Sequence, residues 1–406
     1  MNTRSSFVRA FLISAVVLVA ALCASAASVS PRSTHAKAKS SRITESAHAQ
    51  RRMSQLRHSR VVRASVRVRS RRRFTERFAT SSFAEDQALG DAIGGEDPTV
   101  RQAAIDALGN MNGTVVAIDP GSGRVLAMVN QRLALSAGAI PCSTIKVPVA
   151  LAALSENLIS KDSKVMLNRQ YGMTLTEALA HSNNLYFETV GRRLGFEKYS
   201  YYAHQYGLGE LAGWNIPGEQ PGVFPSTPLE DKLGGVGKMC SFGQSISMTP
   251  LQLGALLSAI ANGGTLYYLQ HPASIDDVVN FQPRVKRHLD IAPVLPQIVP
   301  GMAAVVQYGT GRSVRLSFSD EPVLGKTGTC SNNAGTRYGW FGSFANTDAG
   351  RIVVVVFLQG GRPTYGPKAA EITGHLYRNL EEHNFFESKP SVKSTSTAGI
   401  GTTGIN

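Results

Sequence analysis

The sequence lacks the residue patterns that usually bind metal ions or nucleotides. Its nine histidines are scattered, and neither His-x-x-x-His nor Cys-x-x-Cys spacing occurs. The stretch Gly121-Ser122-Gly123 lies between two strand-like runs, so it indicates a hairpin turn and not a phosphate-binding loop. We therefore expect no metal site and no cofactor.

Charged residues are absent from Ala10 to Ala27. This apolar run follows Arg4 and Arg9 and ends in Ala24-Ser25-Ala26, a pattern typical of an export signal with its cleavage site. The same run is long enough to be an uncleaved membrane anchor. We therefore expect residues 1–27 to be a signal peptide or membrane anchor, and the protein to act in the cell envelope outside the cytoplasm.

Acidic residues are nearly absent from the segment that follows. Between Pro31 and Thr80 there are fifteen lysines and arginines but only Glu45 and Glu76, with few bulky apolar residues. Such a composition predicts disorder, so we interpret residues 28–83 as a basic tether. An exported tether meets anionic lipid headgroups or acidic wall polymers, and not nucleic acid. A solvated spacer without a specific partner is the alternative.

The remaining chain predicts one folded domain, residues 84–386, followed by a disordered Ser/Thr/Gly-rich tail, residues 387–406. Strand patterns occur near both ends of this domain, and helix patterns occur between them. We expect an α+β fold in which an early and a late hairpin form one antiparallel sheet flanked by helices, with an inserted, mostly helical lobe. The expected pieces are a helix at 98–108, strands at 114–119, 124–129, 338–344 and 352–358, and helices at 143–154, 175–181, 250–262 and 367–382.

A serine and a lysine lie three residues apart at the start of an apolar run. Ser143 and Lys146 share one face if a helix begins near Ser143, and residues 147–154 are apolar enough to bury that helix. Burial lowers the pKa of a lysine, which can then accept the proton of a serine nucleophile. On this motif alone, a surface lysine on an ordinary core helix is an equally good interpretation.

Two further motifs follow in the chain. Ser182-Asn183-Asn184 ends the predicted helix at 175–181, and Gly325-Lys326-Thr327-Gly328-Thr329 precedes the late strands. In a strand, Lys326 and Gly328 face one way while Thr327 and Thr329 face the other, so this edge offers an ammonium and hydroxyls to a carboxylate. Gly328 lacks a side chain, which suits close approach of a substrate to the backbone. Alone, either motif is also compatible with an ordinary helix end or turn.

Taken in order, Ser-x-x-Lys, Ser-x-Asn and Lys-Thr-Gly resemble the motifs of the penicillin-recognising acyl serine transferases, which include penicillin-binding transpeptidases and serine β-lactamases. The likeness extends to residues 112–128, 215–222, 241–244, 248–253 and 339–342, and covers nearly the whole predicted domain. It implies a β-lactamase/transpeptidase-like fold.

The resemblance also implies catalytic roles. Ser143 is expected to attack a D-alanyl-D-alanine stem peptide of peptidoglycan, or a β-lactam, and to hold the acyl group. Lys146 is expected to accept the serine proton, and Ser182 to pass a proton towards the leaving amine. The backbone N–H groups of Ser143 and Thr329 are expected to form the oxyanion hole.

Substrate-binding residues follow from the same resemblance. Asn184 is expected to hydrogen-bond the substrate amide. The binding site for the terminal carboxylate is expected to consist of Lys326, Thr327, Gly328 and Thr329.

A disulfide is expected on the same ground. Some serine carbapenemases are similar in having a disulfide at the positions of Cys142 and Cys330, which flank the nucleophile and the Lys-Thr-Gly motif. The alternative is two small buried thiols. Cys240 is expected to be unpaired.

Several functions fit this resemblance. The first is a peptidoglycan D,D-transpeptidase, and the others are a serine β-lactamase, a D,D-carboxypeptidase, or a non-catalytic β-lactam sensor or wall-binding protein. A lactamase needs a base that activates water. Glu219 is the nearest candidate, but its setting, Pro217-Gly218-Glu219-Gln220-Pro221-Gly222, resembles the transpeptidases.

Overall fold

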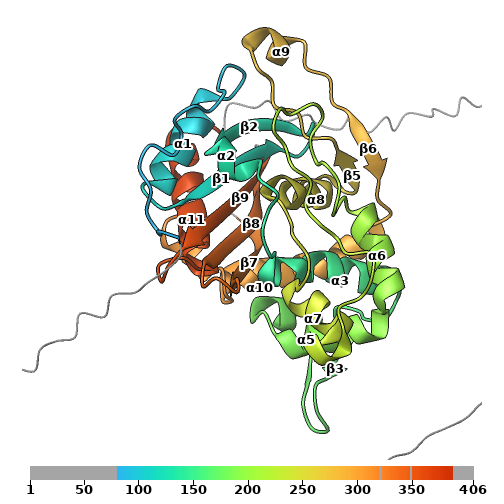
Figure 1. The fold of residues 1–406 in the computed structure, drawn as a ribbon. Coiled ribbons are helices and arrows are strands. Elements are labelled where there is room, and N and C mark those ends of the chain that lie inside the picture. The colour runs from blue at the N-terminus through green and yellow to red at the C-terminus, as the bar shows by residue number, and fades with distance from the viewer. Residues whose placement is uncertain (1–79, 320–321, 348–349, 387–406) are drawn as a thin grey trace, which may run out of the picture. The chain divides into compact units, whose positions relative to one another are not determined.

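A five-stranded antiparallel sheet in the order β2-β1-β9-β8-β7 forms the centre of the computed structural model, which describes residues 80–319, 322–347 and 350–386 (Figure 1). The early hairpin pairs with the late strands as predicted, since Val116 of β1 lies opposite Val355 of β9. The predicted export signal and tail, and nearly all of the tether, lie outside the described residues. The strands are β1 Gly113–Asp119, β2 Arg124–Val129, β7 Val323–Ser331, β8 Arg337–Thr347 and β9 Gly350–Gly360.

Alternate residues of the central strands enter two different cores. Val353 and Val355 of β9 pack in one core, while Val354 and Val356 pack in the other. This division follows from the strand period of two residues, which points successive side chains to opposite faces of the sheet. Both faces are covered, so β9 is a nearly continuous apolar run and not an alternating one.

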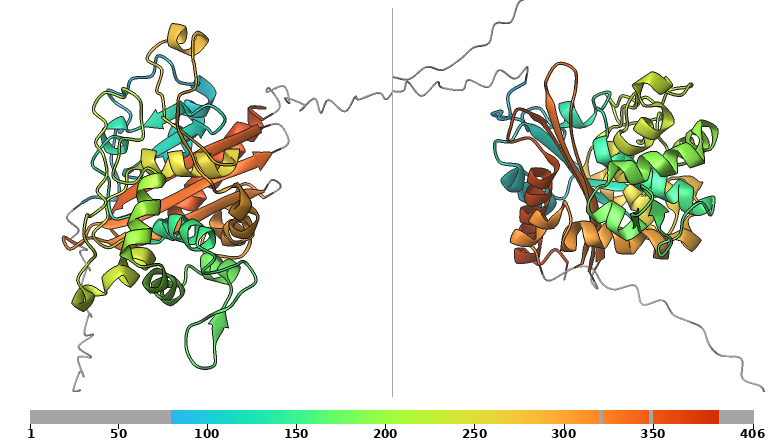
Figure 2. Two further views of the ribbon diagram at one scale, coloured as in Figure 1. Left: turned by 90° about the vertical axis from the view of Figure 1, so that its right-hand side faces the viewer. Right: turned by 90° about the horizontal axis from the view of Figure 1, so that it is seen from below.

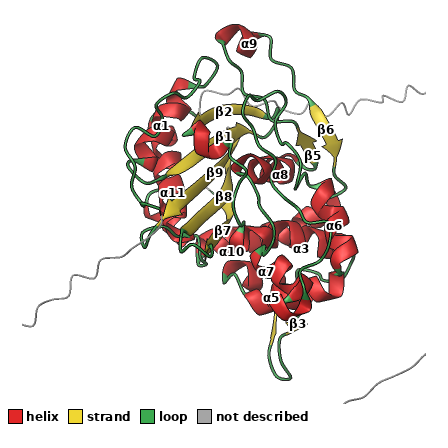
Figure 3. Ribbon diagram, viewed as in Figure 1, coloured by secondary structure: helices red, strands yellow, loops and turns green. Residues whose placement is uncertain are grey.

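One face of the sheet carries α1 (Pro98–Leu108) and α11 (Gly366–Glu382), and the other carries α8 (Pro250–Asn262) (Figure 3). The carboxylate of Asp97 accepts hydrogen bonds from the N–H groups of Thr99 and Val100 and so caps α1. Thr249 and Gln252 form a capping box at the start of α8.

A helical lobe packs beside the β7 edge of the sheet (Figure 2). It holds the predicted helix at 175–181 as α4, together with helices that were not predicted from the sequence. The apolar run after Ser143 is helical, but its α-helix begins at Lys146. The lobe contains η1 Cys142–Ile145, α3 Lys146–Ser155, α4 Leu175–Ala180, α5 Asn184–Leu194, α6 Phe196–Gln205, α7 Gly235–Phe242 and α10 Leu295–Gln307.

Shorter elements complete the described residues: α2 Gln131–Ala134, β3 Val165–Met166, β4 Gly172–Met173, η2 Asp231–Leu233, β5 Thr265–Tyr267, α9 Ile275–Val279, β6 Val285–His288, η3 Ala292–Val294 and η4 Arg312–Leu316. Within the part of the chain that the structure describes, no helix is both long and apolar enough to span a bilayer.

The cap of α1 gives a stability prediction. Asp97→Ala removes the acceptor of two backbone N–H groups and should cost about 1 kcal/mol of unfolding free energy. In thermal melts followed by circular dichroism, this loss should lower the melting temperature by about 2 °C. Asp97→Asn keeps an acceptor oxygen and should melt close to the unaltered protein; an equal drop in both variants would show that the cap is not the cause.

Candidate active site

The start of α3 places Ser143 beside Lys146. Ser143 lies in the 3₁₀ turn η1, and Lys146 is the first residue of α3, so the predicted α-helix from Ser143 is wrong by three residues. The tighter turn still directs both side chains to one place, because Lys146 Nζ lies 2.6 Å from Ser143 Oγ. Ser143 is half-buried, whereas Lys146 is fully buried.

Lys146 Nζ makes two further short contacts. It donates to Asn184 Oδ1 of α5 at 2.7 Å and to the main-chain carbonyl of Ser241 in α7 at 2.6 Å. Each of these two oxygens can only accept a hydrogen bond. The two contacts therefore use two N–H groups of the lysine and leave its third position facing the hydroxyl of Ser143.

The surroundings favour a neutral amine at Lys146. Burial is the main factor that lowers its pKa well below the usual value, the charge of Lys326 lowers it further, and Glu188 acts in the opposite direction. A neutral amine donates twice and accepts once, which matches its three contacts. Lys146 can thus accept the proton of Ser143.

A second buried lysine forms the other half of the site. Lys326 Nζ on β7 donates to Ser182 Oγ at 2.9 Å and to the carbonyl of Thr327 at 3.0 Å. Burial lowers the pKa of Lys326 to about 7. Ser182 contacts Lys326 in this arrangement, while the described partners of Lys146 are Ser143, Asn184 and Ser241.

The threonines of β7 are held by neighbouring elements. Thr327 Oγ1 lies 2.6 Å from Thr310 Oγ1, and Thr329 Oγ1 accepts from the N–H of Gly366 at 2.8 Å. Thr329 is exposed, so its hydroxyl can still contact a ligand. β7 is an edge strand, which leaves one side of its backbone without a neighbouring strand.

Gly328 has a packing role that the sequence did not indicate. A Cβ atom at Gly328 would lie 2.9 Å from the carbonyl oxygen of Pro141 and 3.3 Å from Cβ of Cys142. The missing side chain thus lets β7 approach the segment before the nucleophile. This close approach within the protein is one reason for a glycine at position 328.

Two site residues have left-handed backbone conformations. Cys142 has φ +52° and Ser182 has φ +54°. A non-glycine residue in this region costs of order 1 kcal/mol and persists only where its surroundings hold it. Both strained residues border the reactive groups, since Cys142 precedes Ser143 and Ser182 contacts Lys326.

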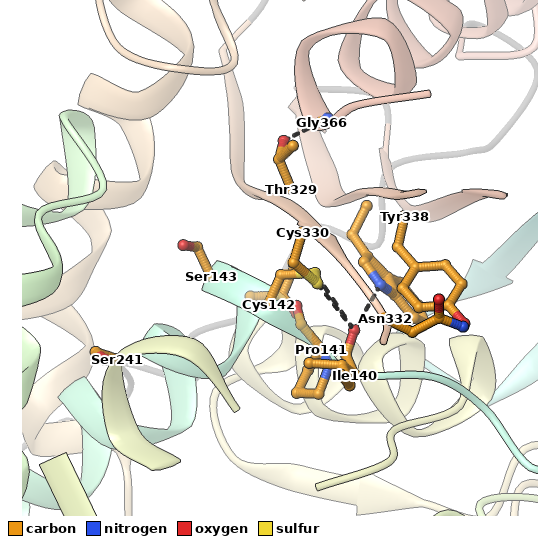
Figure 4. The surroundings of a disulfide bond; sticks show 12 residues. Ile140, Pro141, Cys142, Ser143, Ser241, Thr329, Cys330, Asn332, Tyr338 and Gly366 are labelled. Carbon is orange, nitrogen blue, oxygen red and sulfur yellow. Dashed lines mark hydrogen bonds between the residues drawn. A yellow bond between two sulfur atoms is a disulfide. The ribbon is translucent and has the colours of Figure 1, made fainter. Parts of the chain in front are cut away.

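Cys142 and Cys330 form a disulfide, as the resemblance implied, with a Cα–Cα distance of 5.6 Å (Figure 4). The bond joins η1 to β7, and the side chain of Ser143 extends away from it. The carbonyl of Ile140 accepts a bond from Trp340 Nε1 at 3.1 Å, which fixes the same segment to β8. Cys240 is a free, buried cysteine, as predicted.

Glu219 was the candidate for a base that activates water. Its carboxylate accepts bonds of 2.8–3.1 Å from the N–H groups of Ala212 and Gly213, and burial raises its pKa. These contacts tie Glu219 to its own loop. The role that a lactamase would require of it is therefore not supported.

Sequence reasoning missed two groups of the site. The carbonyl of Ser241 accepts from Lys146, and a main-chain oxygen carries no sequence signal. The hydroxyl of Thr310 bonds to that of Thr327. Thr310 lies between two glycines, Gly309 and Gly311, and this pattern is visible in the sequence. No group of three or more His, Cys, Asp or Glu residues suited to a metal occurs within residues 80–319, 322–347 and 350–386.

Residues 113–378 match the protein family described as the penicillin binding protein transpeptidase domain. The chain belongs to this family. The match contains both buried lysines and both serines of the site, so the described geometry is that of a penicillin-binding protein transpeptidase domain.

Individual relatives agree with this family. Stage V sporulation protein D of Bacillus subtilis is 30% identical over 272 residues, which cover 59% of this chain and 41% of that protein. Peptidoglycan D,D-transpeptidase PbpA of Mycobacterium tuberculosis is 25% identical over 366 residues, which cover 72% of each. The chain spans less than half the length of several curated relatives that it matches.

A solved structure shares the fold. The crystal structure of Pseudomonas aeruginosa PBP2 in complex with WCK 5153 matches with a TM-score of 0.58 and 23% identity, covering 71% of this chain and 77% of that chain. The α+β, β-lactamase/transpeptidase-like fold expected from the sequence is thus confirmed.

The two lysines predict the pH dependence of acylation in this transpeptidase domain. The second-order rate constant for acylation by a fluorescent penicillin should rise with pH as Lys146 loses its proton. Separately, it should fall with a midpoint near pH 7, because Lys326 loses the charge that attracts the drug's carboxylate. Lys326→Arg stays protonated, so the falling limb should disappear. The same falling limb in that variant would rule out Lys326 as its source.

The disulfide predicts a linked loss of stability and acylation. Cys142→Ser with Cys330→Ser opens a connection between residues 188 positions apart, which should cost about 2–5 kcal/mol. Loss of the bond should also displace the backbone N–H of Ser143, which directly follows Cys142. This displacement should slow acylation by roughly tenfold or more. Melting curves and acylation rates with and without a phosphine reductant measure both effects. Cys240→Ala is the control and should respond to reductant like the unaltered protein; no response in either would contradict a structural disulfide.

Proposed function

We propose that the protein is a peptidoglycan D,D-transpeptidase that works through an acyl-enzyme on Ser143. The observation that carries this proposal is the set of three contacts at Lys146, which directs a neutral amine at the hydroxyl of Ser143. Relatives named as peptidoglycan D,D-transpeptidases support the choice of substrate.

The acylation step uses the site as follows. Ser143 Oγ gives its proton to Lys146 Nζ and attacks the carbonyl carbon of the penultimate D-alanine. The N–H groups of Ser143 and Thr329 stabilise the oxyanion; the former lies in the first turn of η1, where no carbonyl of the same helix can accept it. The carbon–nitrogen bond to the terminal D-alanine breaks, and Ser182 gives the leaving nitrogen a proton that Lys326 or Lys146 replaces.

Substrate recognition in this proposal depends on the β7 edge. The charged form of Lys326 attracts the terminal carboxylate, and the hydroxyls of Thr327 and Thr329 lie on the same strand to bond it. The amide nitrogen of Asn184 is left for the substrate, because its oxygen is used by Lys146. The side chain of Asn184 is thus able to contact both the lysine and the substrate.

The second half of the reaction passes the acyl group to an amine of a neighbouring stem peptide. The amine nitrogen attacks the ester carbon and gives a proton to Lys146, the bond between that carbon and Ser143 Oγ breaks, and Lys146 returns the proton to Oγ. Transfer to an amine is favoured over rapid hydrolysis because Glu219, the candidate base for water, is bonded within its own loop. This observation disfavours the lactamase alternative.

We infer further that this chemistry takes place in the cell envelope. The supporting features are the apolar run of residues 10–27 and the basic composition of residues 28–83. In this proposal the first is a signal or an anchor. The second associates with anionic membrane or wall polymers.

Acylation by a penicillin tests the proposed function. The full chain mixed with benzylpenicillin should gain the mass of the drug on Ser143 and keep it for hours, because Glu219, the candidate base for water, is bonded within its own loop. Ser143→Ala should gain no mass, and Ser160→Ala is a matched surface control that should acylate normally. An adduct that vanishes while drug is consumed would indicate a lactamase, and no adduct at all would favour the sensor or wall-binding alternative.

A further inference from the structure

Thr310 lies where three elements of the site meet. It follows the end of α10, its N–H donates to the carbonyl of Ala180 at 3.0 Å, and its hydroxyl oxygen lies 2.6 Å from that of Thr327 on β7. Ala180 is the last residue of α4, two positions before Ser182. Thr310 therefore lies between the turn that carries Ser182 and the strand that carries Lys326.

Main-chain contacts hold the segment 309–311 in place. The N–H groups of Gly309 and Gly311 donate to carbonyls of α10, each at 2.9 Å. A Cβ atom at Gly309 would lie 2.3 Å from the carbonyl oxygen of Ala180, so the segment packs directly against the end of α4. None of these contacts uses the side chain of Thr310. Its hydroxyl is therefore available for another role.

The hydroxyl of Thr310 pairs with that of Thr327. Thr310 is half-buried, and Thr327 is 3% exposed. When two hydroxyls bond, one proton lies between them and the proton of the accepting hydroxyl stays free. A carboxylate can only accept hydrogen bonds. It therefore favours the arrangement in which Thr310 donates to Thr327 and Thr327 directs its free proton at the ligand.

The other threonine of β7 is held in the same way. Thr329 Oγ1 accepts from the N–H of Gly366 at 2.8 Å (Figure 4). This bond occupies an acceptor position of the hydroxyl, so the proton of Thr329 is free for a ligand. Each threonine thus receives a donor from a neighbouring element. The donor at Thr329 is a main-chain N–H, whereas the donor at Thr327 is a side chain that a substitution can remove.

We propose that Thr310 is a positioning residue for recognition of the terminal carboxylate of the stem peptide, and that it acts through the hydroxyl of Thr327. This inference rests on the proposed function, in which the β7 edge binds that carboxylate. Lys326 attracts the carboxylate as a point charge, with little control of its direction. A hydroxyl proton held in one direction fixes the position of the carboxylate, and with it the position of the scissile carbonyl beside Ser143.

Acylation of the full-chain variant Thr310→Val by benzylpenicillin and by its methyl ester tests the proposal. Valine has nearly the shape of threonine but no hydroxyl. The rate constant with benzylpenicillin should fall about tenfold, because the proton of Thr327 is no longer held in one direction. The methyl ester carries no carboxylate charge, so its rate constant should change less than about twofold. Thr310→Ser restores the donor and should recover most of the rate. Thr99→Val, at a half-buried threonine of α1, is the matched control and should react like the unaltered protein.

A double-mutant cycle separates a positioning role from general damage to the site. Thr327→Val should itself slow acylation by benzylpenicillin. Adding Thr310→Val should then cause less than about a twofold further loss, because the two hydroxyls act as one unit. Equal losses with benzylpenicillin and its methyl ester, or losses that multiply in the double variant, would overturn the proposal.

Calorimetry in a Ser143→Ala background separates this inference from the proposed function, because benzylpenicillin then binds without acylation. Thr310→Val should raise the dissociation constant of the drug by about fivefold or more. If penicillin fails to acylate Ser143 while this increase is observed, the transpeptidase proposal fails and the role of Thr310 stands. If Ser143 is acylated and neither the rate nor the dissociation constant depends on Thr310, this inference fails and the transpeptidase proposal stands.

Discussion

The site depends on one buried amine that must be held without a charge. Lys146 has no solvent contact, so a proton on its nitrogen would lack the hydration that stabilises an ammonium in water. Its three partners come from η1, α5 and α7, which the helical lobe packs together. The lobe therefore does more than cover the sheet: it brings a hydroxyl, a carboxamide and a main-chain carbonyl to the same nitrogen.

A second buried lysine, Lys326, further favours the neutral form of Lys146. Lys326 reaches the site from β7 and lowers the pKa of Lys146 whenever it carries a charge. The two lysines thus divide the work in the proposed reaction, with Lys146 accepting the proton and Lys326 meeting the carboxylate. The Cys142–Cys330 disulfide and the glycine at 328 hold η1 against β7. These two features fix the positions of the two lysines relative to Ser143 and Ser182. They also hold Cys142 in its strained backbone conformation.

Much of this arrangement could be predicted from the sequence, because it depends on local signals. The capping groups Asp97 and Thr249 mark helix starts, and the early and late strand runs predict the sheet. Other parts follow only from tertiary packing. Pro300 obscured α10, since a proline inside a helix normally indicates its end, yet packing overrides that signal. The disulfide was expected only from the family resemblance.

Neutron diffraction from crystals of the unliganded protein at neutral pH tests the central claim directly, because it locates deuterons. The account predicts two deuterons on Lys146 Nζ, directed at the oxygens of Asn184 and Ser241, and one on Ser143 Oγ directed at the nitrogen. Three deuterons on Lys146, one of them directed at Ser143, would contradict it. In that case the lysine could not accept the serine proton, and the chemistry proposed for this site would need another base.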